Sequence, residues 1–266
     1  MRPRAPALYR ISRALRIAAT LALVLILLFV GLAFYSAAQV RPKFDPHSST
    51  GFVLASNGTA HLTATLNLSN PGFFAIAPIS VALQLHYPDG SLLALGGSPT
   101  VEVAPGATGV VPVSLWVPLS SATATLLTQD QNLTAHLWAN LTYATLFHLQ
   151  LTALNNLSWG APFEGFSATP GTPQPQSNGT VLVPVQITFR NDASFDVVGT
   201  LTVTIADAQG AACSTTPVTI DTLKGSSFGQ TLSFYLSGGC NPSGGTIVAT
   251  YSGNGLTYAF PPEAIP

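Results

Sequence analysis

One uncharged stretch, Ile17–Ala38, constrains this chain more than any other part of its sequence. It contains 22 residues, nearly all of them apolar. With a rise of about 1.5 Å per residue, a helix of this length is roughly 33 Å long and can cross the hydrocarbon core of a bilayer. The sequence therefore predicts a cytoplasmic basic tail at 1–16, a transmembrane helix at 17–38 and a spacer at 39–50.

The basic residues around this stretch predict its orientation. Five arginines precede it, whereas only Arg41 and Lys43 follow it closely. By the positive-inside rule the N-terminus lies in the cytoplasm and the chain after the helix lies outside the cell. We therefore expect a single-pass signal anchor in the cell membrane, with the lipid bilayer as its partner. A cleaved signal peptide is the alternative, because Ser36-Ala37-Ala38 resembles a cleavage site, although the apolar run exceeds the usual length of about 7–15 residues.

Beyond residue 43 the chain is acidic and poor in charge. Only Arg190 and Lys224 are basic there, against all ten acidic residues of the chain. Such a surface lacks the positive charge that nucleic-acid binding requires, so we expect no nucleic-acid partner. Charged residues make up only 7% of the chain and hydrophobic residues 47%. This balance favours a folded core with a surface of Ser, Thr and Asn over disorder.

Most of the chain after residue 60 alternates between apolar and polar residues with a period of two, which is typical of half-buried strands. Turn residues such as Asn70-Pro71-Gly72 and Pro88-Asp89-Gly90 separate the runs. The clearest runs lie at 62–69, 79–87, 111–117, 181–189, 201–205, 232–236 and 247–251. Two further strands are expected around 134–139 and 143–154, and a short helix within 118–129. The stretch 167–177 has three prolines and no periodicity, which predicts an interdomain linker.

The second half of this pattern repeats the first. Asn57-Gly58-Thr59 matches Asn178-Gly179-Thr180, and Asn70 matches Asn191, both at a shift of 121 residues. Leu-Thr-Tyr-Ala occurs at 141–144 and again at 256–259. Each copy has roughly 100 residues and about seven short strands, as antiparallel sandwiches do. The predicted fold is an all-β ectodomain of two tandem immunoglobulin-like antiparallel β-sandwiches, at 51–166 and 178–266, preceded by one transmembrane α-helix.

The run from Leu62 to Val117 has the layout strand, Asn-Pro turn, strand ending in Asp-Gly, strand, Pro-Gly turn, strand. It resembles the type-2 late-embryogenesis-abundant (water-stress) domain, which is also found in archaea and bacteria. The copy at 181–236 keeps the layout more loosely, with Asn191-Asp192 and Lys224-Gly225 in place of Asn-Pro and Pro-Gly. Bacterial immunoglobulin-like adhesion domains share much of the pattern. The resemblance implies a β-sandwich without catalysis, loosely tied to stress tolerance, and an archaeal source.

No residue pattern predicts catalysis, a cofactor, a metal site or a small-molecule substrate. The five histidines, which lie outside any metal-ligand spacing, are His47, His61, His86, His136 and His148. No G-x-S-x-G nucleophile motif occurs. Asp192 and Asp196 flank a predicted turn, where turn capping explains them better than a calcium site does. We therefore predict that the protein is not an enzyme.

Several residues predict modification or binding at the surface. Cys213 and Cys240 are expected to form a disulfide in an oxidising exterior, with two buried thiols as the alternative. Six N-x-[ST] sequons predict a glycoprotein if the host has the machinery, and unmodified asparagines are the alternative; they are Asn57, Asn67, Asn132, Asn140, Asn156 and Asn178. Aromatic residues available for a ligand surface are Phe73, Phe74, Trp116, Trp138 and Trp159. For Trp116, exposure and burial against the neighbouring domain both remain open.

Three functions fit these predictions. The first is a structural or binding role at the cell surface, with envelope or surface proteins as partners. The second is a secreted or surface-filament subunit whose N-terminal segment is processed or packs with its neighbours. The third is an accessory subunit of a membrane complex, with the chemistry on a partner.

Overall fold

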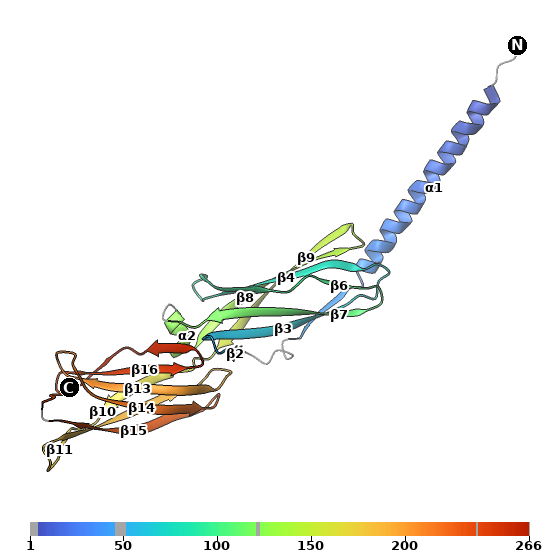
Figure 1. Cartoon of the computed structure of the whole chain (residues 1–266). Coiled ribbons are helices and arrows are strands. Elements are labelled where there is room, and N and C mark those ends of the chain that lie inside the picture. Colours follow the sequence, from blue (N-terminus) through green and yellow to red (C-terminus); the bar gives the residue numbers. More distant parts are fainter. Residues whose placement is uncertain (1–4, 46–51, 121–122, 238, 266) are drawn as a thin grey trace.

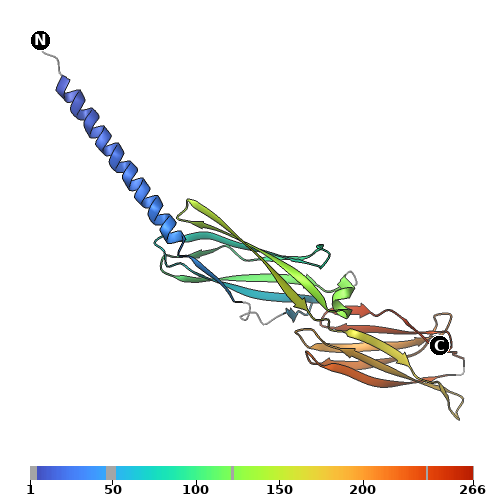
Figure 2. The same cartoon turned by 180° about the vertical axis from the view of Figure 1, so that it is seen from behind.

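The computed structural model describes residues 5–45, 52–120, 123–237 and 239–265, with side chains from Ala19 onward except at 42–45 and 52. A long helix, α1 (Ala5–Ala37), leads into two β-sandwich domains that lie end to end (Figures 1 and 2). At about 1.5 Å per residue α1 is roughly 50 Å long. It includes most of the predicted tail, of which residues 1–4 lie outside the described part of the chain.

In its described residues the first domain consists of nine strands and one short helix. They are β1 (Arg41–Asp45), β2 (Phe52–Leu54), β3 (Thr59–Ser69), β4 (Ile76–His86), β5 (Leu92–Gly97), β6 (Val101–Val103), β7 (Thr108–Pro118), α2 (Ala124–Thr128), β8 (Gln131–Tyr143) and β9 (Phe147–Trp159). The hydrogen-bonded order is β1-β3-β7-β5-β4-β8-β9, and β2 and β6 pair with β3 and β4. All pairings are antiparallel, and β5 connects the two layers because it pairs with both β4 and β7.

Two glycines allow β5 to connect the layers. Gly96 and Gly97 pair with Leu115 and Ser114 of β7 as well as with β4. A Cβ at Gly96 would lie 2.3 Å from the Ser114 carbonyl oxygen. The backbones therefore approach too closely for any side chain, and glycine is required at this crossing.

The described part of the second domain consists of nine further strands in two sheets. They are β10 (Glu164–Pro170), β11 (Gln174–Pro175), β12 (Val181–Arg190), β13 (Val197–Ala206), β14 (Ala212–Thr222), β15 (Ser227–Leu236), β16 (Thr246–Gly253), β17 (Leu256–Ala259) and β18 (Glu263–Ala264). One sheet contains β10, β11, β12 and β15, and the other contains β14, β13, β16, β17 and β18. The all-β class with an N-terminal helix is thus confirmed. The alternating residues form the core, as in β12, where Val183, Val185 and Ile187 are fully buried.

A buried asparagine forms the same corner in both domains. Asn70 and Asn191, matched in sequence, are each fully buried. The Asn70 side-chain amide donates to the carbonyls of Phe74, Val103 and Ala104, and its oxygen accepts from the Gly72 amide. The Asn191 amide likewise donates to the carbonyls of Phe195 and Thr222, and its oxygen accepts from Ala193. The shared network supports duplication more strongly than alternation does, because a buried amide must satisfy each polar atom in a specific geometry.

Three sequence predictions differ from the structure. The stretch 167–177 is not a linker, since β10 and β11 both pair with β12. The spacer contains β1, which pairs with the edge of β3, whereas residues 46–50 lie outside the described part. The prolines in β1, β10 and β11 made these stretches look irregular in the sequence. An edge strand tolerates proline because the backbone on its open side needs no amide donor. The repeated Leu-Thr-Tyr-Ala falls at the end of β8 and in β17, which are not equivalent strands.

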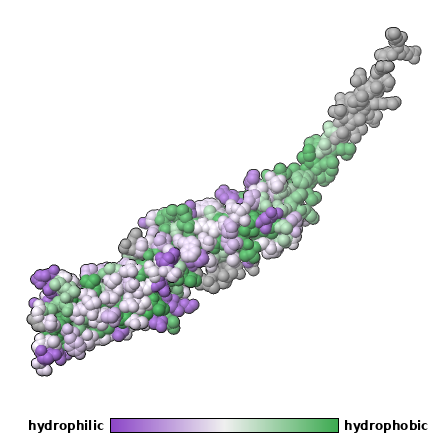
Figure 3. All heavy atoms as spheres, viewed as in Figure 1, coloured by the Kyte–Doolittle hydropathy of each residue, from purple (hydrophilic) through white to green (hydrophobic). Residues whose placement is uncertain are grey.

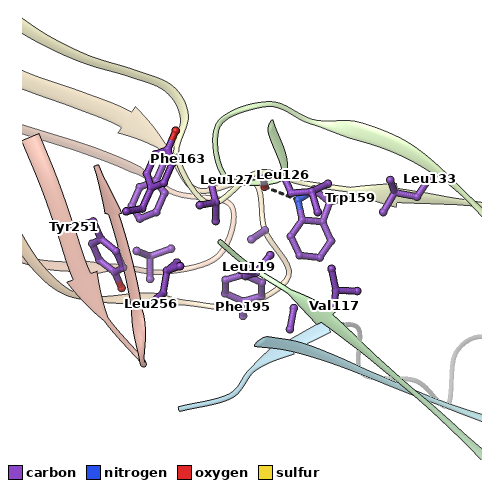
Figure 4. Packing of buried hydrophobic residues seen from close by; sticks show 14 of the residues in the cluster. Val117, Leu119, Leu126, Leu127, Leu133, Trp159, Phe163, Phe195, Tyr251 and Leu256 are labelled. Atoms are coloured by element: carbon purple, nitrogen blue, oxygen red, sulfur yellow. Dashed lines mark hydrogen bonds between the residues drawn. The ribbon is translucent and has the colours of Figure 1, made fainter. Parts of the chain in front are cut away.

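The two domains share a buried junction. Trp159, 2% exposed, lies between α2 and the second domain: its indole nitrogen donates to the Leu126 carbonyl at 2.7 Å, and its ring centre is 6.3 Å from that of Phe195. Figure 4 shows these side chains with Leu127 and Leu256 in one cluster. The chain crosses here near Gly160, where an added Cβ would collide with the Asp192 carbonyl. This buried contact joins the domains without a flexible segment.

Two glycine turns also meet at the junction. The Gly58 amide donates to the Asn254 carbonyl at 3.0 Å, and a Cβ at Gly255 would collide with the Ser56 carbonyl. Gly58 and Gly255 both have positive φ, at 74° and 73°. Glycine is therefore needed for the turn conformation and for the close approach of the two domains.

Candidate functional site

The end of α1 packs against the first domain. Ala33 and Ser36 are buried at this contact, 0% and 1% exposed. Phe29 meets Phe74 of the loop after β3 with ring centres 5.1 Å apart, and Phe34 meets Phe147 at the start of β9 with ring centres 4.5 Å apart. The helix is thus docked on the domain over about two turns.

Hydroxyl groups complete this contact. Ser36 Oγ hydrogen-bonds the Tyr143 hydroxyl, and the Phe73 amide donates to Ser36 Oγ at 2.8 Å. Tyr143 is fully buried. A Cβ at Gly72 would collide with both hydroxyl oxygens. The Asn70 corner therefore fixes a loop whose backbone fits closely against α1.

The apolar part of α1 is long enough to cross a membrane. It extends over Ala19–Ala37, 19 residues with a mean hydropathy of 2.4, and only 11% of its residues are buried in the structure. Figure 3 shows that its apolar surface reaches the adjoining end of the first domain. Both a membrane anchor and an N-terminal signal sequence meet this description.

Strand β9 forms a long unpaired edge. It pairs with β8 along its whole length, and no strand of the described chain pairs with its other side. Residues 148–156 are all exposed, including Leu149, Leu151 and Leu154 at 38%, 39% and 71%. No charged residue occurs between Asp130 and Glu164. The edge lacks the charges and prolines that usually prevent strand addition.

The histidines lie in aromatic contacts on the outer faces of the sheets. His61 stacks on Trp116 with ring centres 3.8 Å apart, and Trp116 is 48% exposed, which answers the open question about its burial. His86 and His136 lie 4.7 Å apart, and His136 also meets Trp138. His148 shares a hydrogen bond with Thr142, whereas His47 lies outside the described residues. Within the described ranges no group of His, Cys, Asp and Glu could hold a metal ion.

The sequons occupy two kinds of site. Asn57 and Asn178 lie in hairpin turns, where each side-chain oxygen accepts from the hydroxyl of its own sequon threonine at 2.6 and 2.7 Å. Three others are exposed on one face of the β8–β9 ribbon, namely Asn132, Asn140 and Asn156. Asn67 is half-buried in β3, between β1 and β7. Glycans on the three ribbon sites would cover a single face.

Cys213 and Cys240 form a disulfide with a Cα–Cα distance of 5.7 Å. It connects the start of β14 to the loop before β16, near the free end of the second domain. The bond closes a loop over 27 residues and restricts the unfolded chain, so its contribution is to the stability of the domain.

An open hollow of about 390 Å³ lies at the domain junction. Its lining includes Asp130, Trp159, Arg190 and Asp192. Asp192 pairs with Arg190 at 2.7 Å, and Asp130 accepts from the Ala161 amide at 2.8 Å. Both carboxylates are engaged in local contacts at the junction, and the ion pair of Asp192 with Arg190 lies within the second domain. Asp196, the other acid near this turn, accepts from the Lys224 amide at 2.9 Å, so it contacts the turn between β14 and β15 rather than capping its own turn.

Comparison with known proteins gives no family. No family model and no curated protein matches the chain. The chain has some likeness to red sea bream transglutaminase, at 9% identity over 83% of this chain and 31% of that one, with a TM-score of 0.31. It also has some likeness to the periplasmic chaperone SfaE, at 12% identity over 82% of this chain and 95% of that one, with a TM-score of 0.28. For the CsuC–CsuE chaperone–tip adhesion subunit complex of Acinetobacter baumannii the identity is 10% over 74% of this chain and 89% of that one, with a TM-score of 0.25. The chain spans about a third of the transglutaminase, and similarity this low carries no argument about function.

Sequence reasoning missed the docking of α1. Its two receiving loops, 71–75 and 144–147, are apolar where exposed turns are usually polar, and this was the available signal. Phe73 is 64% exposed and Leu146 is 56% exposed. The prediction considered Phe73 and Phe74 as ligand-binding aromatics, whereas Phe74 contacts the helix.

Proposed function

We propose that the protein is a single-pass, membrane-anchored protein with a cytoplasmic N-terminus and two extracellular β-sandwich domains. Its role is structural or binding: it projects a rigid stalk from the cell surface. The observation that supports this most is the burial of Ala33 and Ser36 against the first domain. Cleavage after Ala38 would remove both residues and expose Tyr143 and Phe74, so the packing favours retention of the helix.

The distribution of charge supports the same topology. Five arginines precede the apolar segment, and the chain after Lys43 contains only two basic residues. The proposal assigns no catalysis to the chain, and the carboxylates of the junction hollow are engaged, Asp192 by Arg190 and Asp130 by the Ala161 amide. The similarity to the water-stress domain remains part of this proposal, and the two buried asparagine corners support a duplicated sandwich of one kind.

The test is the mass of the native membrane-bound chain. Retention predicts N-terminal peptides from residues 1–38 in the membrane fraction, together with protease-accessible sites beyond residue 50 on whole cells. A chain that begins at Gln39, or one that protease cannot reach from outside, would contradict the proposal. Mass spectrometry of the same material measures glycans at the six sequons.

A filament or surface-assembly subunit is the second candidate. The open edge of β9 favours it, since an unprotected strand of 13 residues is suited to pairing with another chain. This candidate predicts the chain in sheared surface filaments. Its absence from them, with the full chain retained in membranes, would favour the anchored stalk.

A further inference from the structure

The end of the first domain beside α1 has an apolar surface, which we call the collar. It consists of Phe73, Phe74, Leu146 and Phe147, from the loop after β3 and the turn between β8 and β9. Phe74 and Phe147 touch the helix, while Phe73 and Leu146 project outward at 64% and 56% exposure. Neither 70–76 nor 142–149 contains a charged residue. The collar therefore continues the apolar surface of the helix on both sides.

The depth of the helix contacts places the collar at the level of the lipid. Phe29 lies eight residues before the end of the apolar segment at Ala37, which is about 12 Å along a helix. Phe74 touches Phe29, so the loop overlaps the segment that would fill the bilayer. If the helix shifts outward by this distance and so lifts the loop clear of the lipid, Arg13 and Arg16 approach the hydrocarbon core at a cost. If it does not move, the collar enters the interfacial layer.

The second domain provides an internal comparison. At the shift that matches Asn70 with Asn191, Phe73 corresponds to Ser194 and Phe74 to Phe195. The β16–β17 turn has Asn254 and Gly255 at positive φ, whereas the corresponding β8–β9 turn has Ala144 and Thr145 at positive φ. Both domains thus use the same two loops to meet what precedes them. The outward residues are polar where the neighbour is a protein domain and apolar where it is the helix.

We propose that the collar is immersed in the interfacial layer of the lipid bilayer and orients the first domain on the membrane. This inference rests on the proposed membrane anchoring. A lipid surface is the occupant that fits, because the collar is continuous with the lipid-facing side of α1, where Phe34 and Tyr35 are 59% and 66% exposed. Aromatic residues at this depth are characteristic of membrane interfaces.

The test uses the full-length chain in nanodiscs of palmitoyl-oleoyl phosphatidylcholine and phosphatidylglycerol. Single cysteines at Phe73→Cys and Leu146→Cys are labelled with an environment-sensitive fluorophore, since the native cysteines are paired. The matched control is Leu223→Cys, 62% exposed in the second domain. Lipids with a nitroxide on the upper acyl chain are expected to quench both collar labels several-fold more than the control. Thr145→Cys, exposed in the turn beside Leu146, provides a third label position if one variant misfolds.

The outcomes separate this inference from the anchoring itself. Intact mass and flotation with the nanodiscs establish whether residues 1–38 hold the chain in the bilayer. If they do, and the collar labels are quenched no more than the Leu223→Cys label, the collar is not in lipid. If the collar labels are shielded from water but not quenched by nitroxide, and only in discs that hold two chains, a second copy covers the collar. That result would overturn the inference. A chain that does not stay with the discs overturns the anchor and the collar together.

Discussion

The two domains have the same internal corner but different edges. In the first, β5 connects the layers and β9 leaves a 13-residue edge open. In the second, β14 stays with β13 along its whole length, and the far edge consists of the short strands β17 and β18. The two domains therefore share what closes the core, whereas their edges differ. The buried asparagines and turn glycines belong to the shared part.

The contact between the domains is expected to show the largest effect. Trp159→Ala removes a buried side chain at the junction, at a cost of about 3–5 kcal/mol to the free energy of unfolding. It should also uncouple the domains, so that calorimetry resolves two transitions where the wild type has one. Trp116→Ala, on an exposed face, should cost only about 1 kcal/mol. A single, barely shifted transition for Trp159→Ala would mean that the domains are not coupled there.

The equivalence of the two corners is tested by Asn70→Ala and Asn191→Ala. Each change leaves buried carbonyls without a donor, at a cost of about 3 kcal/mol in denaturant unfolding. The two losses should agree within about 1 kcal/mol if the corners are equivalent. Asn67→Ala, in β3 three residues before Asn70, is the control and should stay within about 0.5 kcal/mol. A loss in only one domain would show that the corner has diverged.

The second domain should lose stability at alkaline pH. Burial raises the pKa of Tyr251 to about 12, and its hydroxyl donates to the Val198 carbonyl at 2.8 Å. Since the folded pKa lies above the unfolded value of about 10, this contribution is complete below about pH 10 and is lost as the pH rises toward 12, by about 2 kcal/mol. Tyr251→Phe should flatten this decline, measured by urea unfolding across the range. The exposed Tyr235→Phe should leave it unchanged, and an equal decline in both variants would contradict the assignment.

The open edge of the first domain should affect association more than stability. Leu154→Lys places a charge on β9 and should change the free energy of unfolding by no more than about 0.5 kcal/mol. Sedimentation in detergent should show reduced self-association of the full chain if β9 pairs with another copy. Tyr235→Lys, at similar exposure, is the control. Identical sedimentation of all three proteins would indicate that β9 stays unpaired.

Alternation of apolar and polar residues predicted most strands, because each of these strands buries only one of its two faces. The turn residues, which repeat in the same order in both halves, matched Asn70 with Asn191. Alternation failed where strands lie at edges: β1, β10 and β11 contain proline, and their pairing depends on a distant partner strand rather than on their own pattern. The repeated Leu-Thr-Tyr-Ala misled for a related reason, because four residues of alternation fit any strand.

The hydroxyl contacts at the end of α1 could not be predicted from any one segment of the sequence. Ser36, Gly72 and Tyr143 come from three separate segments, and each alone has an ordinary explanation. Only the tertiary arrangement brings their hydroxyl and backbone groups together. The apolar turns at 71–75 and 144–147 were the trace of this contact in the sequence, since exposed turns usually contain polar residues.

The backbone contact between Gly58 and Gly255 has a mechanical consequence. No side chain separates the two turns, so bending the second domain toward this point meets incompressible main chain at once. A sideways load on the distal tip is then transmitted through the first domain to the end of α1 as torque. Two domains joined in this way resist or transmit force together, which two domains on a slack tether would not do.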